Sequence, residues 1–420
     1  MTDQDQTSGT ALWNAQAHMP SVAERQIVIS RGEGSYIYTT DGRRLFDGTA
    51  SLWFANIGHG RKEMAEAAYR QMLNLETYHV FGRYTTDRSV ALADRLASLS
   101  PIEDCKVIFT SGGSDSIDTA CKLARRHWQL RGRTSKRTIL SRQFAYHGLH
   151  AYGTSITGLD FNREGYGTES LVPETARVSN ADIDAVARVI DEIGAENIAA
   201  LVFEPIQGTG GVNPPPPGYL EGLERICRDN DILRITDEVI TGFGRTGRMF
   251  ASERYGLQSD LVTFAKGVTS GYAPLGGILI APSVWEPYFS PQSELTFRHG
   301  VTYSGHATAC AVAETNLDIL EKEHLLERAE KLELTLHHEL DSLSDLDAVE
   351  DIRVAGFLGG VSLRADLDAP AIADDLVDRG FIVRALRGNT LQLSPPLVTT
   401  DEEVVQLAAA LRESLVDADR

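Results

Sequence analysis

Cysteine is scarce in this chain, and positive charge is low relative to negative charge. The 420 residues include four cysteines, which form no CxxC pair and no spacing typical of a metal site. We therefore expect reduced thiols, and neither a disulfide scaffold nor a metal centre. Lys plus Arg number 40 against 59 for Asp plus Glu, a net charge of −19. Such an acidic chain repels phosphate backbones and anionic membrane surfaces, which argues against nucleic-acid and membrane partners.

Long apolar runs are also missing. No stretch reaches the roughly 20 apolar residues of a membrane span, and the opening MTDQDQTSGT lacks the apolar core of a secretory signal. A cytoplasmic protein is therefore expected. Apolar residues make up 42% and charged residues 24%, which is typical of globular proteins. The length fits two or three domains, or one large α/β domain with a smaller companion.

Strand-like apolar runs alternate with helical patterns from about residue 105 to 285. The runs are KVIFT (106–110), RTILS (137–141), IAALVF (198–203), ILRIT (232–236), LVTFA (261–265) and GGILIA (276–281). This alternation predicts a mostly parallel sheet covered by helices on both faces. The segment 36–60 has a hairpin signal at Asp41-Gly42. After residue 306, helices and short strands indicate a smaller α+β domain, whose last helix begins after Thr400.

Small and aromatic residues follow two of these runs. Open parallel sheets bind ligands beyond the carboxyl ends of their strands. Ser111-Gly112-Gly113-Ser114 follows the first run and opens a helix, where backbone N–H groups can hold a phosphate. A plain capped turn explains this segment equally well. Tyr146 follows the second run and is able to stack on a planar ligand, although by itself a packed tyrosine is the simpler interpretation.

Three ionisable residues follow the next runs: Glu204, Asp237 and Lys266. A carboxylate at the end of a buried strand needs a cationic partner. For Asp237 that partner is either a protonated ring nitrogen of a ligand or a nearby arginine such as Arg245. A lysine at such a rim can lose its proton and attack a carbonyl group, whereas a solvated surface lysine is the ordinary alternative.

Taken together, these residues suit one cofactor. A phosphate cradle, a stacking aromatic ring, an acid for a ring nitrogen and an amine for a Schiff base are what pyridoxal phosphate requires. Each follows its own strand in the predicted sheet. No GxGxxG motif follows an early strand, which argues against a nicotinamide-dependent dehydrogenase.

The chain resembles the class III aminotransferases, of the ω-amine:pyruvate transaminase type, from about residue 30 to 415. The matching blocks are DGRRLFDG, SLWFANIGHG, TSGGSDS, AYHG, FEPIQGTGG, DEVITGFGRTG, TFAKGV, HGVTYSGH and LSPPLVTT. The resemblance implies the α/β fold type I of pyridoxal-phosphate-dependent transferases, with a mostly parallel sheet in a large domain and a smaller α+β domain. It assigns 1–50 and 323–420 to the small domain and 51–322 to the large, cofactor-binding domain.

The resemblance also implies roles for single residues. Lys266 corresponds to the Schiff-base lysine and Asp237 to the acid that pairs with the pyridine nitrogen. Thr302 corresponds to a phosphate contact supplied by the neighbouring subunit, which implies a homodimer with shared active sites and leaves a tetramer open. The expected cofactor-binding residues are Gly113, Ser114, Tyr146, Glu204, Asp237, Val239, Lys266 and Thr302.

Substrate contacts are expected from Trp53, Tyr146 and a mobile arginine that binds the keto acid. Arg384 is the first choice for this arginine and Arg387 the second, because the region has one residue more than the family pattern. The implied reaction is a ping-pong transfer of an amino group from a diamine, a β-amino acid or another ω-amine to a keto acid, with pyruvate as the expected acceptor. A racemase or aminomutase on the same fold is the alternative.

Two departures from the family pattern stand out. Gly112 replaces a serine of the phosphate cradle, although backbone amides could still hold the phosphate. Arg234 interrupts a strand that is otherwise apolar, and nothing in the sequence explains it.

Overall fold

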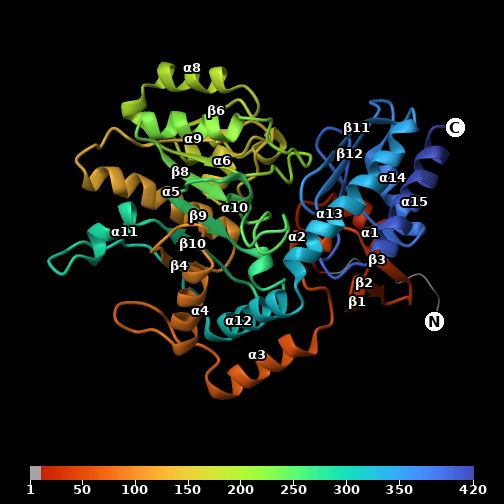
Figure 1. Ribbon diagram of the computed structural model, residues 1–420, viewed down its shortest axis with the longest axis horizontal. Coiled ribbons are helices and arrows are strands. Elements are labelled where there is room, and N and C mark those ends of the chain that lie inside the picture. Colours follow the sequence, from red (N-terminus) through yellow and green to blue (C-terminus); the bar gives the residue numbers. More distant parts are fainter. Residues whose placement is uncertain (1–10) are drawn as a thin grey trace.

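The computed structural model describes residues 11–420. Figure 1 shows two halves side by side: a larger one built around a central sheet, and a smaller one in which the first strands of the chain lie beside its last helices. The candidate site residues come from both halves.

The central sheet has the strand order β4-β10-β9-β8-β7-β5-β6. Its strands are β4 (Lys106–Thr110), β5 (Thr138–Arg142), β6 (Thr175–Val178), β7 (Ile198–Phe203), β8 (Leu233–Asp237), β9 (Leu261–Phe264) and β10 (Gly276–Ile280). β10 is antiparallel to both of its neighbours, and the other pairs are parallel. The predicted mostly parallel sheet is confirmed, and β6 is an edge strand that the sequence did not predict.

Helices cover this sheet on both sides, as continuous apolar strands require. In and around the larger half they are α3 (Lys62–Asn74), α4 (Asp87–Ser98), α5 (Gly113–Leu130), α6 (Ala151–Ile156), α7 (Thr168–Leu171), α8 (Ile183–Ile193), α9 (Tyr219–Asp229), α10 (Ala251–Tyr255), α11 (Pro282–Phe289) and α12 (Ala307–Lys322). The longest of them, α5, packs against β10 and β9 and begins directly after β4 through the turn predicted to hold a phosphate.

The smaller half contains two four-stranded sheets, ordered β1-β2-β3-β13 and β11-β12-β15-β14. Their strands are β1 (Ile29–Glu33), β2 (Tyr36–Thr39), β3 (Arg44–Asp47), β11 (Val349–Val354), β12 (Gly359–Leu363), β13 (Phe381–Ile382), β14 (Arg384–Leu386) and β15 (Thr390–Leu393). β2 and β3 form the predicted hairpin. β13 pairs in parallel with β3, so segments more than 300 residues apart share one sheet. The division of the chain at residues 50 and 322 stays a prediction.

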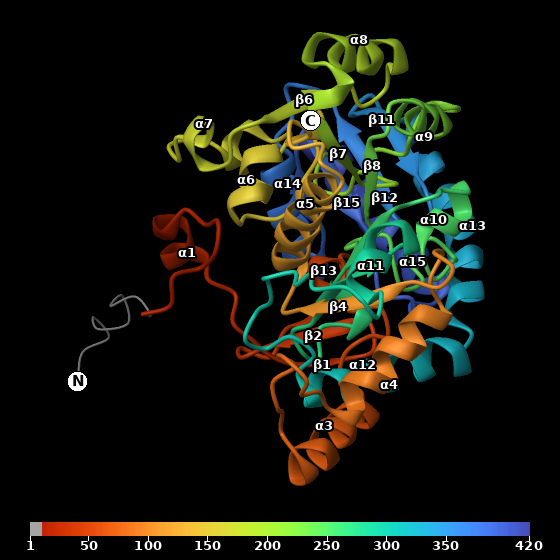
Figure 2. The same cartoon turned by 90° about the vertical axis from the view of Figure 1, so that its left-hand side faces the viewer.

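The remaining helices are α1 (Met19–Arg25), α2 (Ala50–Trp53), α13 (Leu325–Asp341), α14 (Ala369–Asp378) and α15 (Asp401–Ala418). The Thr400 hydroxyl caps α15 by accepting from the Glu403 amide, as predicted. α1 buries none of its residues and lies away from the body of the protein (Figure 2). Within residues 11–420, no helix combines the length and the apolar character that a membrane crossing needs.

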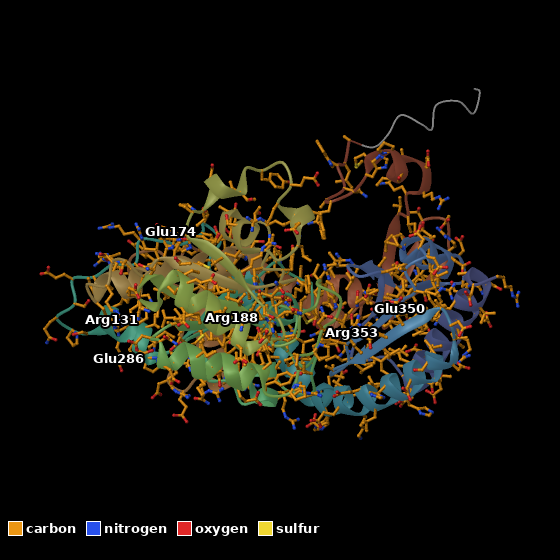
Figure 3. All side chains as sticks on the ribbon, turned by 90° about the horizontal axis from the view of Figure 1, so that it is seen from above. Arg131, Glu174, Arg188, Glu286, Glu350 and Arg353 are labelled. Atoms are coloured by element: carbon orange, nitrogen blue, oxygen red, sulfur yellow. The ribbon has the colours of Figure 1, made fainter. Side chains whose placement is uncertain are left out.

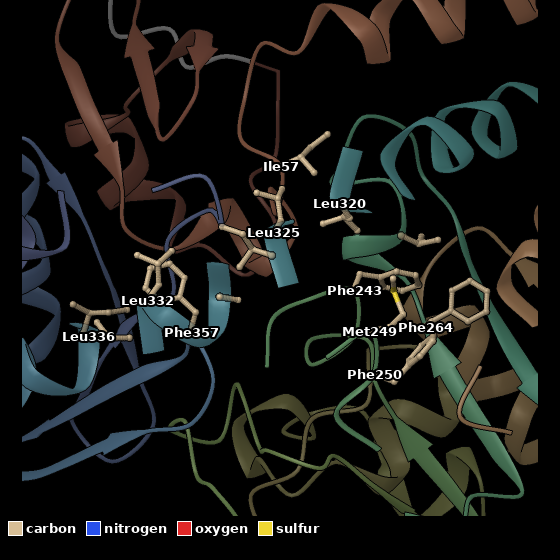
Figure 4. Packing of buried hydrophobic residues seen from close by; sticks show 14 of the residues in the cluster. Ile57, Phe243, Met249, Phe250, Phe264, Leu320, Leu325, Leu332, Leu336 and Phe357 are labelled. Atoms are coloured by element: carbon tan, nitrogen blue, oxygen red, sulfur yellow. The ribbon is translucent and has the colours of Figure 1, made fainter. Parts of the chain in front are cut away.

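One apolar cluster extends through both halves. Phe243 and Phe264 belong to its part near the central sheet, and Leu332 and Phe357 to its part near α13. Figure 4 shows this cluster running between the two groups by way of Leu325. Because protein interiors are close-packed, a shared core of this kind holds the two halves in a defined relation.

Arg234 now has an explanation. It lies on β8, and its guanidinium binds the Asp260 carboxylate, with Nε at 3.0 Å from Oδ2. The same carboxylate accepts from the Arg234 backbone amide at 2.8 Å. Both side chains are largely buried, with 17% and 14% exposed, so the strand carries a charge whose partner lies in the loop directly before β9.

We expect Arg234→Ala to lower the free energy of unfolding by about 3 kcal/mol, because it leaves the largely buried Asp260 carboxylate without its cation. Arg228 forms an ion pair with Asp229 that is mostly exposed, so Arg228→Ala should cost less than about 1 kcal/mol. Urea denaturation of both variants measures the difference. Equal costs would contradict the assigned role of the Arg234 pair.

Candidate functional site

The predicted cofactor residues meet in one pocket at the carboxyl ends of the parallel strands. Lys266, Asp237, Glu204, Tyr146 and Val239 all line it, together with Gly113 and Ser114 at the start of α5. Further lining residues are Ile117, His147, Gly148, Ile206, Ile240 and Ala265. The strand-end logic of open parallel sheets therefore predicted where these groups lie.

Lys266 follows β9 and begins a short 3-10 turn, Lys266–Val268. Its backbone has a φ of 44°, a left-handed conformation that is uncommon outside glycine. Asn316 of α12 holds this turn, since its side-chain amide donates to the carbonyls of Gly267 and Val268 at 2.9 and 3.0 Å. The strained turn thus has a fixed support from a neighbouring helix.

The Lys266 amine is a poor base for a lysine and a good nucleophile near neutral pH. Burial lowers its pKa to about 8, and the Arg384 charge acts in the same direction. The carboxylates of Asp237 and Glu204 oppose this shift. Within residues 11–420 the amine nitrogen has no hydrogen-bond partner, so its lone pair is available for attack on a carbonyl group.

Asp237 lies at the end of β8 and is 5% exposed. His147 donates to it from Nδ1 at 2.8 Å, the Val239 amide donates at 3.0 Å, and the Thr263 hydroxyl donates at 3.2 Å. These bonds hold the carboxylate as an acceptor facing the pocket. A protonated ring nitrogen is a suitable further partner for it.

Glu204 is buried at the end of β7. Its two carboxylate oxygens accept from the backbone amides of Tyr146 and Gly208, at 3.1 and 3.0 Å. Burial raises the pKa of Glu204, while His147 and the Arg142 guanidinium act against this rise. The carboxylate therefore fixes the segment that carries Tyr146 and adds negative charge beside the amine.

The start of α5 has the form of an anion cradle. Gly113 has no side chain, and a Cβ at this position would lie 3.0 Å from Val239. The Ser114 hydroxyl accepts from the Leu149 amide at 3.1 Å, and a Cβ on Gly148 would lie only 2.4 Å from that hydroxyl oxygen. The backbone amides at the start of this 18-residue helix are thus left accessible to an anion.

Trp53 and Arg384 approach the same pocket from the smaller half. The Arg384 guanidinium carbon lies 5.0 Å from the centre of the Trp53 ring, and the Lys266 amine lies 5.6 Å from it. Tyr146 interacts electrostatically with Arg384. The predicted substrate residues are therefore adjacent to the predicted catalytic amine.

The loop that carries Trp53 is strained and is held by one carboxylate. Ala50, Ser51 and Trp53 have φ values of 46°, 59° and 62°. Asp47 accepts from the Ser51 amide at 2.7 Å, from the Thr49 hydroxyl at 3.0 Å and from His59 Nε2 at 2.8 Å. Residues in such conformations persist when surrounding bonds over-determine them, and they cluster at functional sites.

Two predicted residues lie elsewhere. Thr302 is exposed and does not line this pocket. Arg387 is also exposed and its guanidinium stacks on Phe144 at 3.6 Å. The alternative that Arg245 neutralises Asp237 is wrong, because Arg245 is fully buried and donates to the carbonyls of Phe357, Ser394 and Pro395 and to Asn56.

Sequence reasoning assigned no role to His147 or Asn316. His147 stands directly after Tyr146, so its position beyond a predicted strand was a usable signal for a ligand-facing residue. Asn316 lies within a helix far from any predicted strand end, and no local pattern marks it. Its importance becomes visible only through its contacts with the Lys266 turn.

Comparison with known proteins gives the same family as the motifs. The family described as aminotransferase class-III matches residues 19–415. A β-alanine–pyruvate aminotransferase of Pseudomonas aeruginosa is 35% identical, over 96% of each chain. A diaminobutyrate–2-oxoglutarate transaminase of Halomonas elongata is 34% identical, over 91% of this chain and 88% of the relative. The crystal structure of a PLP-bound amine transaminase from an uncultivated Pseudomonas species superposes with a TM-score of 0.93 at 34% identity, covering 98% and 100% of the two chains.

We expect acetylation of Lys266 by trace acetic anhydride, in protein freed of small-molecule ligands, to rise with pH through a midpoint near 8. The reason is that the reactive free amine forms as pH passes the lowered pKa. Peptide mass spectrometry at each pH measures the site. In Asp237→Asn the midpoint should move to lower pH, since the carboxylate raises this pKa. A Lys266 midpoint above pH 10 would contradict the buried, unpaired amine.

Proposed function

The chain belongs to the class III aminotransferases, which use pyridoxal phosphate, and from this premise we propose that it transfers an amino group from an ω-amine type donor to a keto acid, with pyruvate as the acceptor. The main support for this proposal is the arrangement of the pocket, in which the unpaired Lys266 amine and the Asp237 carboxylate lie together beside an anion cradle. The names of the relatives include both pyruvate and 2-oxoglutarate as acceptors.

The residues present fit the cofactor. Gly113 and Ser114 would hold its phosphate, Asp237 its ring nitrogen and Lys266 its aldehyde, with Tyr146 and Val239 on the two ring faces. At Gly113 a Cβ would meet Val239 at 3.0 Å, so the absence of a side chain there leaves the close backbone approach that a phosphate needs. When bound, the cofactor supplies an electron-poor ring that stores the electron pair of a broken C–H bond.

Lys266 is also the group that can move the proton. Its pKa of about 8 allows it to accept a proton from the substrate carbon and return it, as general acid–base catalysis requires near the working pH. Asp237, held by three hydrogen bonds, keeps its charge directed at the ring position. Asn316 maintains the turn from which the lysine acts.

Trp53 and Arg384 are proposed to define the substrate pocket. The indole face suits an apolar amine chain, and a guanidinium can pair bidentately with the carboxylate of a keto acid. Arg384 is preferred to Arg387 because only Arg384 lies beside Trp53.

We propose a homodimer in which Thr302 reaches the partner's phosphate site. Thr302 is exposed and outside its own chain's pocket, which supports a role in trans. Exposed apolar side chains on the same face, including Phe81, Val90 and Phe289, border an open cavity lined by Trp285 and Tyr288, and a second copy would cover them. A single-chain mass by light scattering would contradict this.

We also propose a cytoplasmic location. The four cysteines are buried and unpaired, as expected where thiols remain reduced. A disulfide in the protein isolated from its source would argue against it.

We expect Lys266→Ala to abolish amino transfer, because among the described residues that line the pocket Lys266 alone carries an amine that can bind the cofactor aldehyde or carry the proton. The assay follows alanine formed from pyruvate, and in parallel glutamate formed from 2-oxoglutarate, across a panel of diamines, β-amino acids and arylalkyl amines. Lys331, on α13, gives a matched Lys331→Ala control that should retain activity. Conversion of a single substrate with no keto acid consumed would favour the racemase or aminomutase alternative, and wild-type transfer by Lys266→Ala would contradict the assignment.

A further inference from the structure

Arg384 and Gln392 face each other across the β14–β15 hairpin. They are direct partners in the antiparallel register, so their side chains leave the same face of the sheet with Cβ atoms roughly 5 Å apart. Gly360 of β12 and Arg353 of β11 continue this row. Gly360 packs against the loop at Val212, where an added Cβ would lie 3.0 Å from the valine Cβ, so this face points toward the larger half.

The two arginines of the row differ in their bonding. Arg353, labelled on β11 in Figure 3, donates to the carbonyls of Gly211 and Val212 at 2.9 and 3.0 Å and to the Ser362 hydroxyl. The Arg384 guanidinium makes no hydrogen bond or ion pair within residues 11–420 and only lies over the Trp53 ring. Burial lowers the pKa of Arg384, as expected for a charge with little compensation.

Gln392 has the opposite deficiency to Arg384, because it has a hydrogen-bond acceptor without a donor. Its side chain is 1% exposed, and its carboxamide nitrogen donates to the Ser394 hydroxyl. The Ser394 hydroxyl accepts this bond and lies 3.5 Å from the Thr49 carbonyl. Gln392 Oε1 is left buried without a hydrogen-bond partner. A buried unpaired acceptor of this kind needs an explanation.

We propose that Gln392 Oε1 is the resting partner of the Arg384 guanidinium, and that Gln392 is therefore a specificity-determining residue for the exchange between amine and keto acid. The proposal rests on the aminotransferase reaction proposed above. A carboxylate-free amine leaves Arg384 unpaired in a partly buried pocket, which is costly. Turning the guanidinium toward Gln392 satisfies both groups at once and clears the space beside Trp53. When a keto acid enters, its carboxylate replaces the amide as the partner of Arg384.

A substrate-binding role for Gln392 fits less well. An ammonium group of a diamine could use an amide oxygen, but Arg384 stands directly across the strand pair and would repel it. Arg384 itself is the cation that the geometry brings to this oxygen. In the structure the guanidinium lies over the Trp53 ring, within the same pocket region as the amide oxygen that faces it across the strand pair.

If Gln392 is the resting partner, the apparent affinity for a keto acid depends on the fraction of molecules in which Arg384 is hydrogen-bonded to residue 392. Apparent dissociation constants scale inversely with the fraction of protein in the binding-competent state. A stronger resting partner must weaken keto-acid binding, and an apolar residue at 392 must strengthen it. For a carboxylate-free amine the apolar residue has the opposite effect, because Arg384 then remains unpaired beside Trp53.

The test is a double-mutant cycle on the holoenzyme, read by calorimetric titration with pyruvate in the absence of amine, so that no turnover occurs. We expect Gln392→Leu to tighten pyruvate binding by about threefold to tenfold and Gln392→Glu to weaken it by more than tenfold, since bonds to charged groups are the stronger ones. In the Arg384→Ala background both effects should vanish. The KM of a carboxylate-free amine should rise in Gln392→Leu and stay within about twofold of wild type in Gln392→Glu.

The outcomes separate the two proposals. If Arg384→Ala leaves pyruvate binding unchanged, the assignment of Arg384 as the carboxylate site fails. If Arg384→Ala weakens binding but the Gln392 variants shift it in the same direction, or shift it equally without Arg384, the resting partner is refuted while the proposed function stands. Thermal denaturation checks folding of each variant, and Gln392→Met, which keeps the volume without the acceptor, should reproduce Gln392→Leu if either variant is unstable.

Discussion

The site depends on one poorly solvated amine that lies beside two carboxylates. Transfer of charged groups into a protein interior is costly unless each finds partners. Glu204 and Asp237 find theirs in backbone amides, His147 and Thr263, so the cost of burying them is largely offset. Lys266 has no such partner, and its pKa is lowered because the charged form of the amine is poorly stabilised. The Lys266 amine is thus reactive because the fold leaves its desolvation without a compensating partner.

This arrangement requires an unusual backbone. Left-handed conformations at Lys266 and Trp53 place the amine and the indole where regular strands and helices would not. Each costs energy, and each has its own support: Asn316 for the lysine turn and Asp47 for the loop of Trp53. Both supports come from outside the pocket itself, which explains why residues remote from the chemistry are needed to define it.

The sequence predicted the chemical half of the site better than the substrate half. Polar residues directly after apolar runs can be read locally, and the sheet order then brings Asp237 and Lys266 together without further information. Arg384 and Trp53 were assigned through resemblance alone, because their meeting depends on β13 pairing with β3 across more than 300 residues. Arg234 remained unexplained for a similar reason, since its partner Asp260 lies on a loop whose position follows only from the folded sheet.

The two halves of the site also differ in how freely they can change. The lysine, the aspartate and the cradle are fixed by parallel strands that share buried neighbours, so a substitution there disturbs the core. Arg384 and Gln392 form one cross-strand pair on a short hairpin outside the central sheet, so a change there alters the partner of a charge and leaves the strands that carry the lysine and the aspartate in place. In a family whose relatives carry names with different donors and acceptors, selectivity is therefore more easily adjusted on this hairpin than among the groups that perform the chemistry. The residue opposite Arg384 can adjust selectivity in this way, because a buried glutamine there changes the preferred position of the guanidinium without changing its charge.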